Sequence, residues 1–422
     1  MPRLAPSLFW RARSQISPLA PVLLPACRDL ESAANELRWI REHVRDNPSP
    51  IPESIRIWQF VEKRGKGVPL QYVLGTQPFG DLDIRCRPGV LIPRPETESY
   101  TLHLANLLFR SLSTSSLQQP TNPEPLKILD LCTGTGCIPL LLFSTLLRLL
   151  PASSSSSQLP SHIQIHGVDI SPAAVRLARE NLHRAVAQRR IPSSSSSPVP
   201  YEVVFHQGDV FDPSSVLRWS SLLSASPALP QGGQRQPTSQ TATEEREEVE
   251  EEGIDLLTIN PPYISPHGFA RTTARSVRNY EPKLALVPPT DLPQISTTAT
   301  GCVLDHDRIL RPHDVFYPLT LEIANLLKSK RVFMEVGSLE QAARVVRFYL
   351  RQQQLQRQQR RRRSGEGEQN RNGNGSGSFT TVEIWRDEPS LGDRGERTAV
   401  DGTQVLVRGE GRARGVFLSR VD

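Results

Sequence analysis

The sequence has few cysteines, and their spacing does not match that of small domains stabilised by disulfides or zinc. The 422-residue chain has five, an odd number, and no two are spaced as C-x-x-C. This argues against a disulfide framework and against a zinc site. We therefore expect no metal and reduced thiols at Cys27, Cys86, Cys132, Cys137 and Cys302.

Long apolar runs are also missing. No stretch supplies the ~20 apolar residues that a membrane-spanning helix needs, and Leu140–Leu150 is better explained as a buried helix. Only 37% of the residues are hydrophobic and 37 are prolines, so part of the chain is expected to be unstructured. The sequence predicts a soluble protein without membrane contact, long enough for two domains.

Acidic residues are absent from the first 28 positions, where arginines alternate with apolar residues. This composition is typical of a mitochondrial presequence, because a secretory signal would have a longer uninterrupted apolar core. We predict a presequence at residues 1–28 and a location in the mitochondrial matrix. An ordinary disordered amino terminus is the alternative.

The net charge of +6 does not identify a nucleic-acid-binding protein by itself. The charge is scattered or lies in low-complexity tracts, as in Arg360–Arg363, where a solvated loop is the simpler explanation. These tracts fall between the expected helices and strands, which indicates disordered insertions in a rigid fold. We expect them near residues 151–160, 191–199, 227–252 and 352–378.

Two short amphipathic helices, around residues 30–44 and 55–61, predict a small helical domain at residues 29–67. Gln71–Leu74 and Leu82–Cys86 look like strands joined around glycines, which predicts a β-hairpin linker at residues 68–92. The remainder, residues 93–422, alternates apolar strands with helices and is expected to be an α/β domain. Its strands are expected at Lys127–Asp130, Ile163–Val168, Tyr201–His206, Ile254–Ile259, Arg331–Val336, Thr381–Arg386 and Gly415–Ser419.

A glycine-containing turn follows the first of these strands. Glycines between a strand and a helix let the backbone approach a ligand closely, and the helix that follows offers unpaired N–H groups. The turn lacks the G-x-G-x-x-G of dinucleotide folds, and Asp130 four residues before Gly134 is closer to the adenosylmethionine pattern. An unrelated strand-to-helix turn is the alternative.

Acidic residues follow the next two strands. Asp169 ends the second strand, where nucleotide-binding α/β folds hold a ribose diol; its alternative role is to help cap the next helix. Asp209 and Val210 follow the third strand and are placed to flank an adenine ring.

The fourth strand ends abruptly at Asn260-Pro-Pro-Tyr263, because neither proline can donate to a strand ladder. The chain must turn at a strand's carboxyl end, where open α/β sheets build ligand crevices. Asn260 offers a side-chain carbonyl and Pro261 a backbone carbonyl, with Tyr263 as a wall. Two acceptors suit a planar amino group that has two hydrogens to donate. A plain proline turn, or a proline-rich ligand for another protein, is the alternative.

Taken together, Leu91-Ile-Pro-Arg-Pro-Glu-Thr-Glu98, the Asp130–Gly136 loop, Asp169 and Asn260–Tyr263 resemble the HemK/PrmC family of release factor N5-glutamine methyltransferases. The resemblance implies a class I methyltransferase domain with a seven-stranded, mostly parallel sheet, a helical amino-terminal domain and a hairpin linker. It implies S-adenosyl-L-methionine as cofactor and the glutamine of the Gly-Gly-Gln loop of a mitochondrial release factor as substrate. We expect a monomer without a direct nucleic-acid substrate.

Carried onto this chain, the resemblance assigns residues to two roles. It implies that the glutamine is held by Asn260, Pro261, Pro262 and Tyr263, and that the cofactor is bound by Asp130, Cys132, Thr133, Gly134, Thr135, Gly136, Asp169, Asp209, Val210 and Asn260. It also implies structural roles for Asn279–Pro282 and Glu335–Gly337. Cys132 stands where many members have glycine, so we expect crowding at the methionine end of the cofactor.

Two rival functions remain open. An amino-methyltransferase acting on adenine or guanine in nucleic acid would use the same tetrapeptide, although it should bring a basic face or an added reader domain. A catalytically silent assembly factor on the same fold is the other. A further hypothesis concerns Gly232-Gly-Gln234, within the expected insertion, which could act as an intramolecular pseudo-substrate; chance in a Gly- and Gln-rich tract is the simpler explanation.

Overall fold

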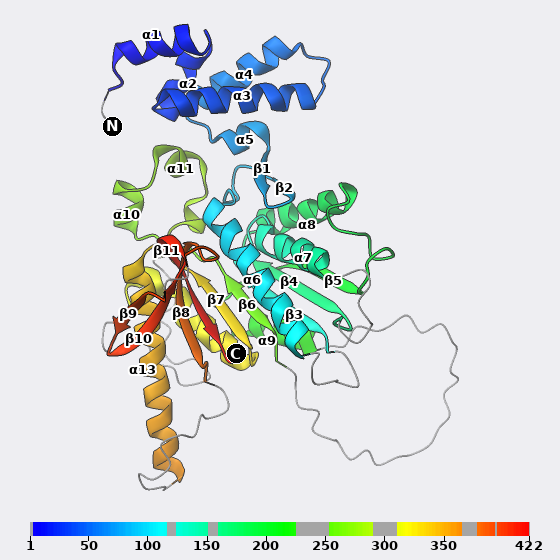
Figure 1. The fold of residues 1–422 in the computed structure, drawn as a ribbon, viewed down its shortest axis with the longest axis vertical. Coiled ribbons are helices and arrows are strands. Elements are labelled where there is room, and N and C mark those ends of the chain that lie inside the picture. Colours follow the sequence, from blue (N-terminus) through cyan, green and yellow to red (C-terminus); the bar gives the residue numbers. More distant parts are fainter. Residues whose placement is uncertain are drawn as a thin grey trace.

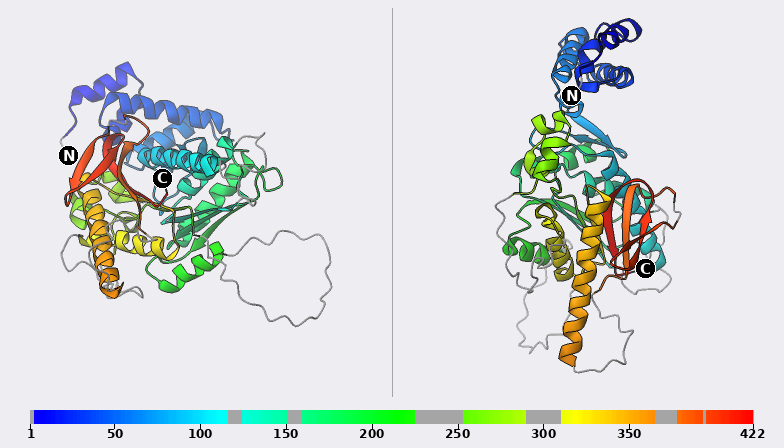
Figure 2. Two further views of the ribbon diagram at one scale, coloured as in Figure 1. Left: turned by 60° about the horizontal axis from the view of Figure 1, so that its bottom comes forward. Right: turned by 90° about the vertical axis from the view of Figure 1, so that its left-hand side faces the viewer.

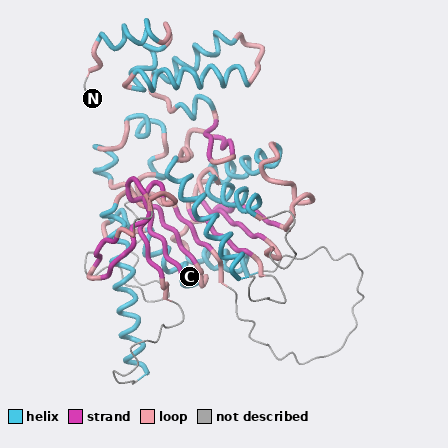
Figure 3. Tube along the Cα trace, in the orientation of Figure 1, coloured by secondary structure: helices cyan, strands magenta, loops and turns pink. Residues whose placement is uncertain are grey.

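The structure is a computed structural model that describes residues 3–115, 124–150, 159–224, 253–289, 310–364, 378–392 and 395–421. Helices gather at one end, and a large sheet flanked by helices forms the rest (Figure 1). Figure 3 shows the same division, with the strands of the large sheet side by side below the helical end. Gly232-Gly-Gln234 and Cys302 lie outside the described residues.

Five helices form the amino-terminal domain: α1 (Pro6–Gln15), α2 (Ala20–Cys27), α3 (Leu30–Asp46), α4 (Glu53–Gly65) and α5 (Leu70–Leu74). Asp29 caps α3 by accepting a hydrogen bond from the Ser32 backbone at 2.7 Å. The apolar face of α3 packs against α2 and α4 in one core. Helical spacing in the sequence predicted α3 and α4.

The domain begins earlier than the predicted boundary at residue 29. Four residues of α1 and α2 are fully buried in the same core as α3 and α4: Ala12, Ala20, Leu23 and Leu24. A short apolar helix with few charges can pack in a domain core or act as a mitochondrial presequence. Composition alone therefore did not distinguish between these two roles. The prediction of mitochondrial import through residues 1–28 stays a prediction.

The predicted strand at Gln71–Leu74 is wrong, because this segment is α5. Pro69 precedes its first turn, and Gly75 ends it in the left-handed conformation at φ 84°. The hairpin follows immediately, as β1 (Thr76–Phe79) paired antiparallel with β2 (Leu82–Arg85). The hairpin itself is therefore present, with its second strand where it was predicted and its first strand at Thr76–Phe79 in place of Gln71–Leu74.

A nine-stranded sheet with the order β5-β4-β3-β6-β7-β11-β8-β10-β9 forms the centre of the second domain. Five of its eight neighbouring pairs are parallel, which confirms the mostly parallel sheet. The seven predicted strands lie together, and two strands missed in the sequence, β9 and β10, extend one edge. The bounds are β3 (Leu126–Leu131), β4 (Ile163–Asp169), β5 (Tyr201–Gln207), β6 (Leu256–Ile259), β7 (Arg331–Glu335), β8 (Thr381–Glu388), β9 (Arg397–Val400), β10 (Thr403–Arg408) and β11 (Glu410–Ser419).

Helices cover both faces of this sheet (Figure 2). One face packs against α6 (Pro95–Ser115), α7 (Cys137–Leu149) and α8 (Pro172–Ala187), and the other against α9 (Pro213–Ser224), α12 (Phe316–Leu326) and α13 (Leu339–Ser364). Ten consecutive residues of α7 are buried, which confirms a core helix there. Among the described residues, no helix has the length and apolarity to cross a membrane.

Two of the predicted insertions are partly ordered. Residues 352–364 continue α13 as helix, since Gln, Leu and Arg are good helix formers. Residues 193–197 form a loop between buried Ile191 and Val199. The other tracts lie mostly outside the described residues. Short helices α10 (Pro266–Arg271) and α11 (Arg275–Tyr280) lie between the two domains in Figure 1.

Candidate active site

A cavity of ≈ 290 Å³ lies at the carboxyl ends of β3, β4, β5 and β6. It brings together most of the residues predicted from the sequence: Cys132, Thr133, Gly134, Thr135, Asp169, Asp209, Val210, Asn260 and Pro262. Four of the predicted residues do not line it: Asp130, Gly136, Pro261 and Tyr263. The structure therefore gathers nine of the predicted residues around one cavity and leaves the other four outside its lining.

The turn after β3 needs left-handed backbone at three positions, Cys132 (φ 58°), Gly134 (φ 57°) and Gly136 (φ 76°). Space around Gly134 is open, since a Cβ there would meet no atom within 4 Å. At Gly136 a Cβ would lie 3.0 Å from the Ala178 Cβ, so this glycine serves packing at the start of α7. Glycine is the natural residue for such backbone, which explains why Cys132 is unusual here.

Asp169 fixes the shape of the cavity. Its two carboxylate oxygens accept hydrogen bonds from the backbone N–H groups of Gly134 and Ser171, both at 2.9 Å. Burial raises the pKa of Asp169 above its ordinary value, and these two hydrogen bonds oppose the rise. Ser171 itself caps α8 by accepting from Ala174 at 3.3 Å. Asp169 thus joins the turn after β3 to the turn after β4, beyond the capping role considered for it.

Asp130 lies behind the turn and is fully buried. Its Oδ1 accepts a 2.6 Å hydrogen bond from the Thr258 hydroxyl on β6. Burial raises the pKa of this carboxyl group to about 7, although the hydrogen bond from Thr258 opposes the shift. Asp130 therefore connects β3 to β6 beneath the turn.

Two residues of the tetrapeptide after β6, one polar and one apolar, line the cavity. Asn260 is half-buried and Pro262 is buried, and both line the wall. Within the described part of the chain no hydrogen bond engages the Asn260 side chain, so its carbonyl remains available to a ligand. Tyr263 points to the other side, where its hydroxyl donates to Glu335 Oε1 at 3.2 Å.

A second network supports the opposite wall. Glu281, almost completely buried, accepts from Arg94 Nη2 at 2.9 Å on both oxygens and from the Ile92 backbone at 3.2 Å. Ile92 and Arg94 line the cavity. The segment Asn279–Pro282 therefore shapes the site through Glu281. Sequence reasoning expected a structural role there without identifying Arg94 as its partner.

Two aromatic residues on the wall were not predicted. Phe211 and Phe316 line the cavity, and their ring centroids lie 4.9 Å apart in an edge-on arrangement. Phe211 follows Val210 directly, which is a local signal, whereas Phe316 begins a distant helix and gave none.

Comparison with known proteins decides the family. The chain is 34% identical over 287 residues to the mitochondrial MRF1 N(5)-glutamine methyltransferase MTQ1 of Saccharomyces cerevisiae, and the match spans 68% of each chain. It is also 30% identical over 258 residues to the release factor glutamine methyltransferase of Geobacter sulfurreducens, covering 61% of this chain and 63% of that one. This chain belongs to the release factor glutamine methyltransferase family.

The remaining comparisons add less. A relative in Schizosaccharomyces pombe of the same mitochondrial type is 34% identical over 273 residues, which is 63% of this chain and 69% of the relative. No protein-family model matches the chain. Similarity to solved structures is distant: the amino-terminal domain of human METTL16 in complex with SAH aligns at 12% identity and a TM-score of 0.33, over 94% of this chain and 95% of that one.

S-adenosyl-L-methionine is the cofactor of this methyltransferase family, and the cavity fits it. The open space at Gly134 admits a ligand close to the backbone. The Asp169 carboxylate is the acceptor that a ribose diol needs, and apolar Val210 and Phe211 suit an adenine ring. Burial and neighbouring carboxylates raise the pKa of the Cys132 thiol well above its usual value, so the thiol beside the cofactor space stays protonated at neutral pH.

Proposed function

We propose that this chain transfers the methyl group of S-adenosyl-L-methionine to the side-chain amide nitrogen of the glutamine in the Gly-Gly-Gln loop of a mitochondrial peptide chain release factor. One observation carries the proposal: Asn260, with its side-chain carbonyl unengaged by described residues, lines the same cavity as the Cys132–Thr135 turn and Asp169. Family membership and the names of the yeast relatives support the substrate and the mitochondrial location.

The mechanism depends on position. A glutamine nitrogen is a weak nucleophile because its lone pair is delocalised into the carbonyl group. When bound, the cofactor supplies an electrophilic sulfonium methyl group. Asn260 Oδ1 accepts one of the two N–H bonds and holds the nitrogen in line, and such positioning can lower a barrier by ~7–11 kcal/mol. This hydrogen bond strengthens as positive charge develops on nitrogen, so it favours the transition state. The nitrogen then loses one proton to water.

Replacing Asn260 tests this proposal. We expect Asn260→Ala to reduce methyl transfer by roughly 100-fold or more, the effect of removing a comparable acceptor or donor elsewhere. Cofactor binding should stay nearly normal, because Asp169 and the turn after β3 are unchanged. Isothermal titration with cofactor and a turnover assay with release factor measure the two quantities on the same preparation. Near-normal turnover in the variant would sink the mechanism.

A further inference from the structure

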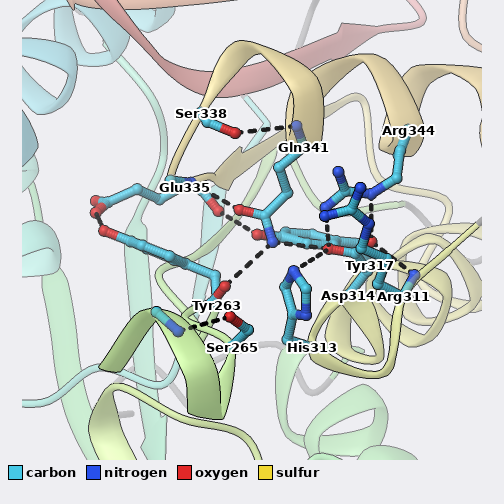
Figure 4. Close-up of polar contacts among 12 residues, drawn as sticks. Tyr263, Ser265, Arg311, His313, Asp314, Tyr317, Glu335, Ser338, Gln341 and Arg344 are labelled. Carbon is cyan, nitrogen blue, oxygen red and sulfur yellow. Dashed lines mark hydrogen bonds and ion pairs between the residues drawn. The ribbon is translucent and has the colours of Figure 1, made fainter. Parts of the chain in front are cut away.

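Tyr263, in the turn that carries Asn260, is hydrogen-bonded to residues at the junction between β7 and α13 (Figure 4). The Tyr263 hydroxyl donates to Glu335 Oε1 at 3.2 Å, and the Tyr263 carbonyl accepts from Gln341 Nε2 at 3.3 Å. A Cβ at Gly337 would lie 3.0 Å from the Tyr263 ring, so the ring rests on this glycine. Tyr263 is thus fixed at both its backbone and its side chain.

Gln341 is held in one orientation. Its Oε1 accepts from the Gly337 N–H at 2.8 Å, and its Nε2 donates to Asp314 Oδ1 at 2.8 Å as well as to Tyr263. A flipped amide would set an oxygen against the Asp314 carboxylate and an N–H against the Gly337 N–H. Gln341 therefore uses its full side-chain amide to join Gly337, Asp314 and Tyr263.

Asp314 keeps this arrangement charged and rigid. It is fully buried and accepts from Arg344 Nε at 2.7 Å, Arg344 Nη2 at 3.0 Å and the Arg311 backbone at 2.9 Å. Burial disfavours the carboxylate, yet the hydrogen bonds from Arg344, Arg311 and Gln341 together hold the pKa of Asp314 below its usual value. An ionised Asp314 requires a donor from Gln341, so the amide orientation follows from the ion pair.

Glu335 completes the support from the other side. Its Oε2 accepts from the Thr97 hydroxyl at 2.9 Å and from the Tyr100 hydroxyl at 2.7 Å, both on α6. Its Oε1 is left for Tyr263. Thr97 belongs to the Leu91–Glu98 segment, so this carboxylate joins the two family motifs on either side of the cavity. Gln341, Asp314 and Glu335 do not line the cavity, and Gln341 reaches the turn that carries Asn260 through its hydrogen bond to Tyr263.

We propose that Gln341 is a positioning residue for methyl transfer: by holding the Tyr263 carbonyl while Glu335 holds its hydroxyl, it sets where the Asn260 acceptor meets the substrate amide. The inference rests on the proposed function and extends it to residues that touch neither substrate nor cofactor. Because displacement of a positioned group by about 1 Å can reduce rate by ~100-fold, loss of this support should appear in kcat.

Three variants of α13 test the role. Gln341→Met keeps the bulk of the side chain and removes its hydrogen bonds. Gln341→Glu keeps the acceptor for Gly337 and removes the donors to Asp314 and Tyr263. Gln353→Met is the matched control, since Gln353 is also buried on α13 but bonds Ser378 instead. Assays are run with full-length chain, cofactor and release factor below the unfolding temperature of every variant.

Both Gln341 variants are expected to lower kcat by about 10- to 100-fold with less than about a twofold change in the cofactor dissociation constant, and the control should retain wild-type kcat. Unchanged kcat in Gln341→Met, even with a lower Tm, would overturn the inference. So would a normal Gln341→Glu beside an impaired Gln341→Met, since donation to Tyr263 would then be irrelevant.

An inactive wild-type chain would refute the proposed function separately. Hydrogen exchange of the peptide containing residues 260–264 then tests the positioning role on its own. Faster exchange in both Gln341 variants than in wild type and control supports it, and equal exchange overturns it.

Discussion

Single side chains at strand ends define what this site can bind. Asp169 is the clearest case, since each of its carboxylate oxygens already accepts a backbone N–H and both oxygens retain further lone pairs for a ligand. Asn260 provides the corresponding acceptor after β6. Under the proposed function Asp169 serves cofactor binding and Asn260 serves methyl transfer, so we expect their variants to fail in different ways.

Asp169→Ala is expected to weaken cofactor binding. Charge-assisted hydrogen bonds to a diol contribute ~1.5–3 kcal/mol, which corresponds to about a 10- to 150-fold rise in the dissociation constant. Isothermal titration measures it directly, with Asp212→Ala as a control on a carboxylate that caps α9 outside the cavity. If Asp169→Ala bound cofactor with wild-type affinity, Asp169 would serve only to hold the two turns.

Cys132 adopts left-handed backbone, which predicts an effect on stability when it is replaced. A non-glycine residue in the left-handed region costs ~1–2 kcal/mol. Replacing it by glycine removes this strain, but glycine also loses more conformational entropy on folding, which offsets part of the gain. The free energy of unfolding of Cys132→Gly should therefore equal that of wild type or exceed it by up to ~1 kcal/mol. The variant should bind cofactor no more weakly than wild type. Cys132→Ala keeps the strain and serves as the comparison in thermal unfolding. A glycine variant less stable than the alanine variant would contradict this account.

Short, contiguous motifs could be placed on the fold from the sequence. The turn after β3 and the Asn260–Tyr263 tetrapeptide each follow one strand, so their place at the sheet edge followed from strand direction. The support of Tyr263 could not be predicted in this way. Its members come from positions 97, 100, 314, 335 and 341, and only the folded chain shows that these side chains converge.

At the scale of elements, the pairing of neighbouring strands creates features that the sequence does not display. β4 and β5 place His166 and His206 together, with Nδ1 and Nε2 2.8 Å apart and the rings stacked at 5.1 Å. Burial lowers the pKa of each imidazole to about 4. For His206 the neighbouring His166, Arg218 and Arg179 add to the shift, and Glu202 opposes it. Both rings are therefore neutral in the folded protein at pH 7.

This pair should make the fold sensitive to acid. An unfolded histidine protonates near pH 6.5, whereas these rings resist protonation until about pH 4. Their contribution to stability is thus fully present above pH 6.5 and is lost as the pH falls through that window. We expect the Tm of wild type to fall between pH 7 and 5, and the double variant His166→Phe/His206→Phe to fall less. His267→Phe, at an exposed position, is the control. Equal slopes in all three proteins would exclude the pair as the cause.

Helix α5 and strands β9 and β10 show where element prediction fails. Gln71–Leu74 has the residues of a strand, but Pro69 and Gly75 impose helical boundaries on it. β9 has four residues, most of them not buried, and the apolar run of β10 is limited to Val405–Val407, so neither shows the longer apolar run that revealed most of the buried strands.

At the scale of the whole molecule, the helical domain is continuous from α1 to α5. Its core contains nine buried residues, of which four, Ala12, Ala20, Leu23 and Leu24, come from the segment predicted to be a presequence. Tyr280 links this domain to the methyltransferase domain through a 3.3 Å hydrogen bond to the Lys66 carbonyl. Cleavage of residues 1–28 would therefore remove part of the core of the helical domain.

Removing residues 1–28 should destabilise the helical domain, because it exposes the faces of α3 and α4 that α2 covers. Replacing a single buried leucine by alanine typically costs 2–5 kcal/mol, and here two leucines are removed together. Hydrogen exchange of peptides from α3 and α4 during thermal unfolding reports on this domain, and removal of residues 1–4 is the control. A truncated chain that unfolds at the wild-type temperature would show that α1 and α2 are dispensable.

The central claim concerns the acceptor of the methyl group. The most direct measurement incubates the purified chain with S-adenosyl-L-methionine and the mitochondrial release factor, and then locates the added mass by tandem mass spectrometry. The account predicts one methyl group on the side-chain amide nitrogen of the Gly-Gly-Gln glutamine with wild type, and none with Asn260→Ala. An unmodified glutamine, or transfer to adenine or guanine of added nucleic acid instead, would contradict it.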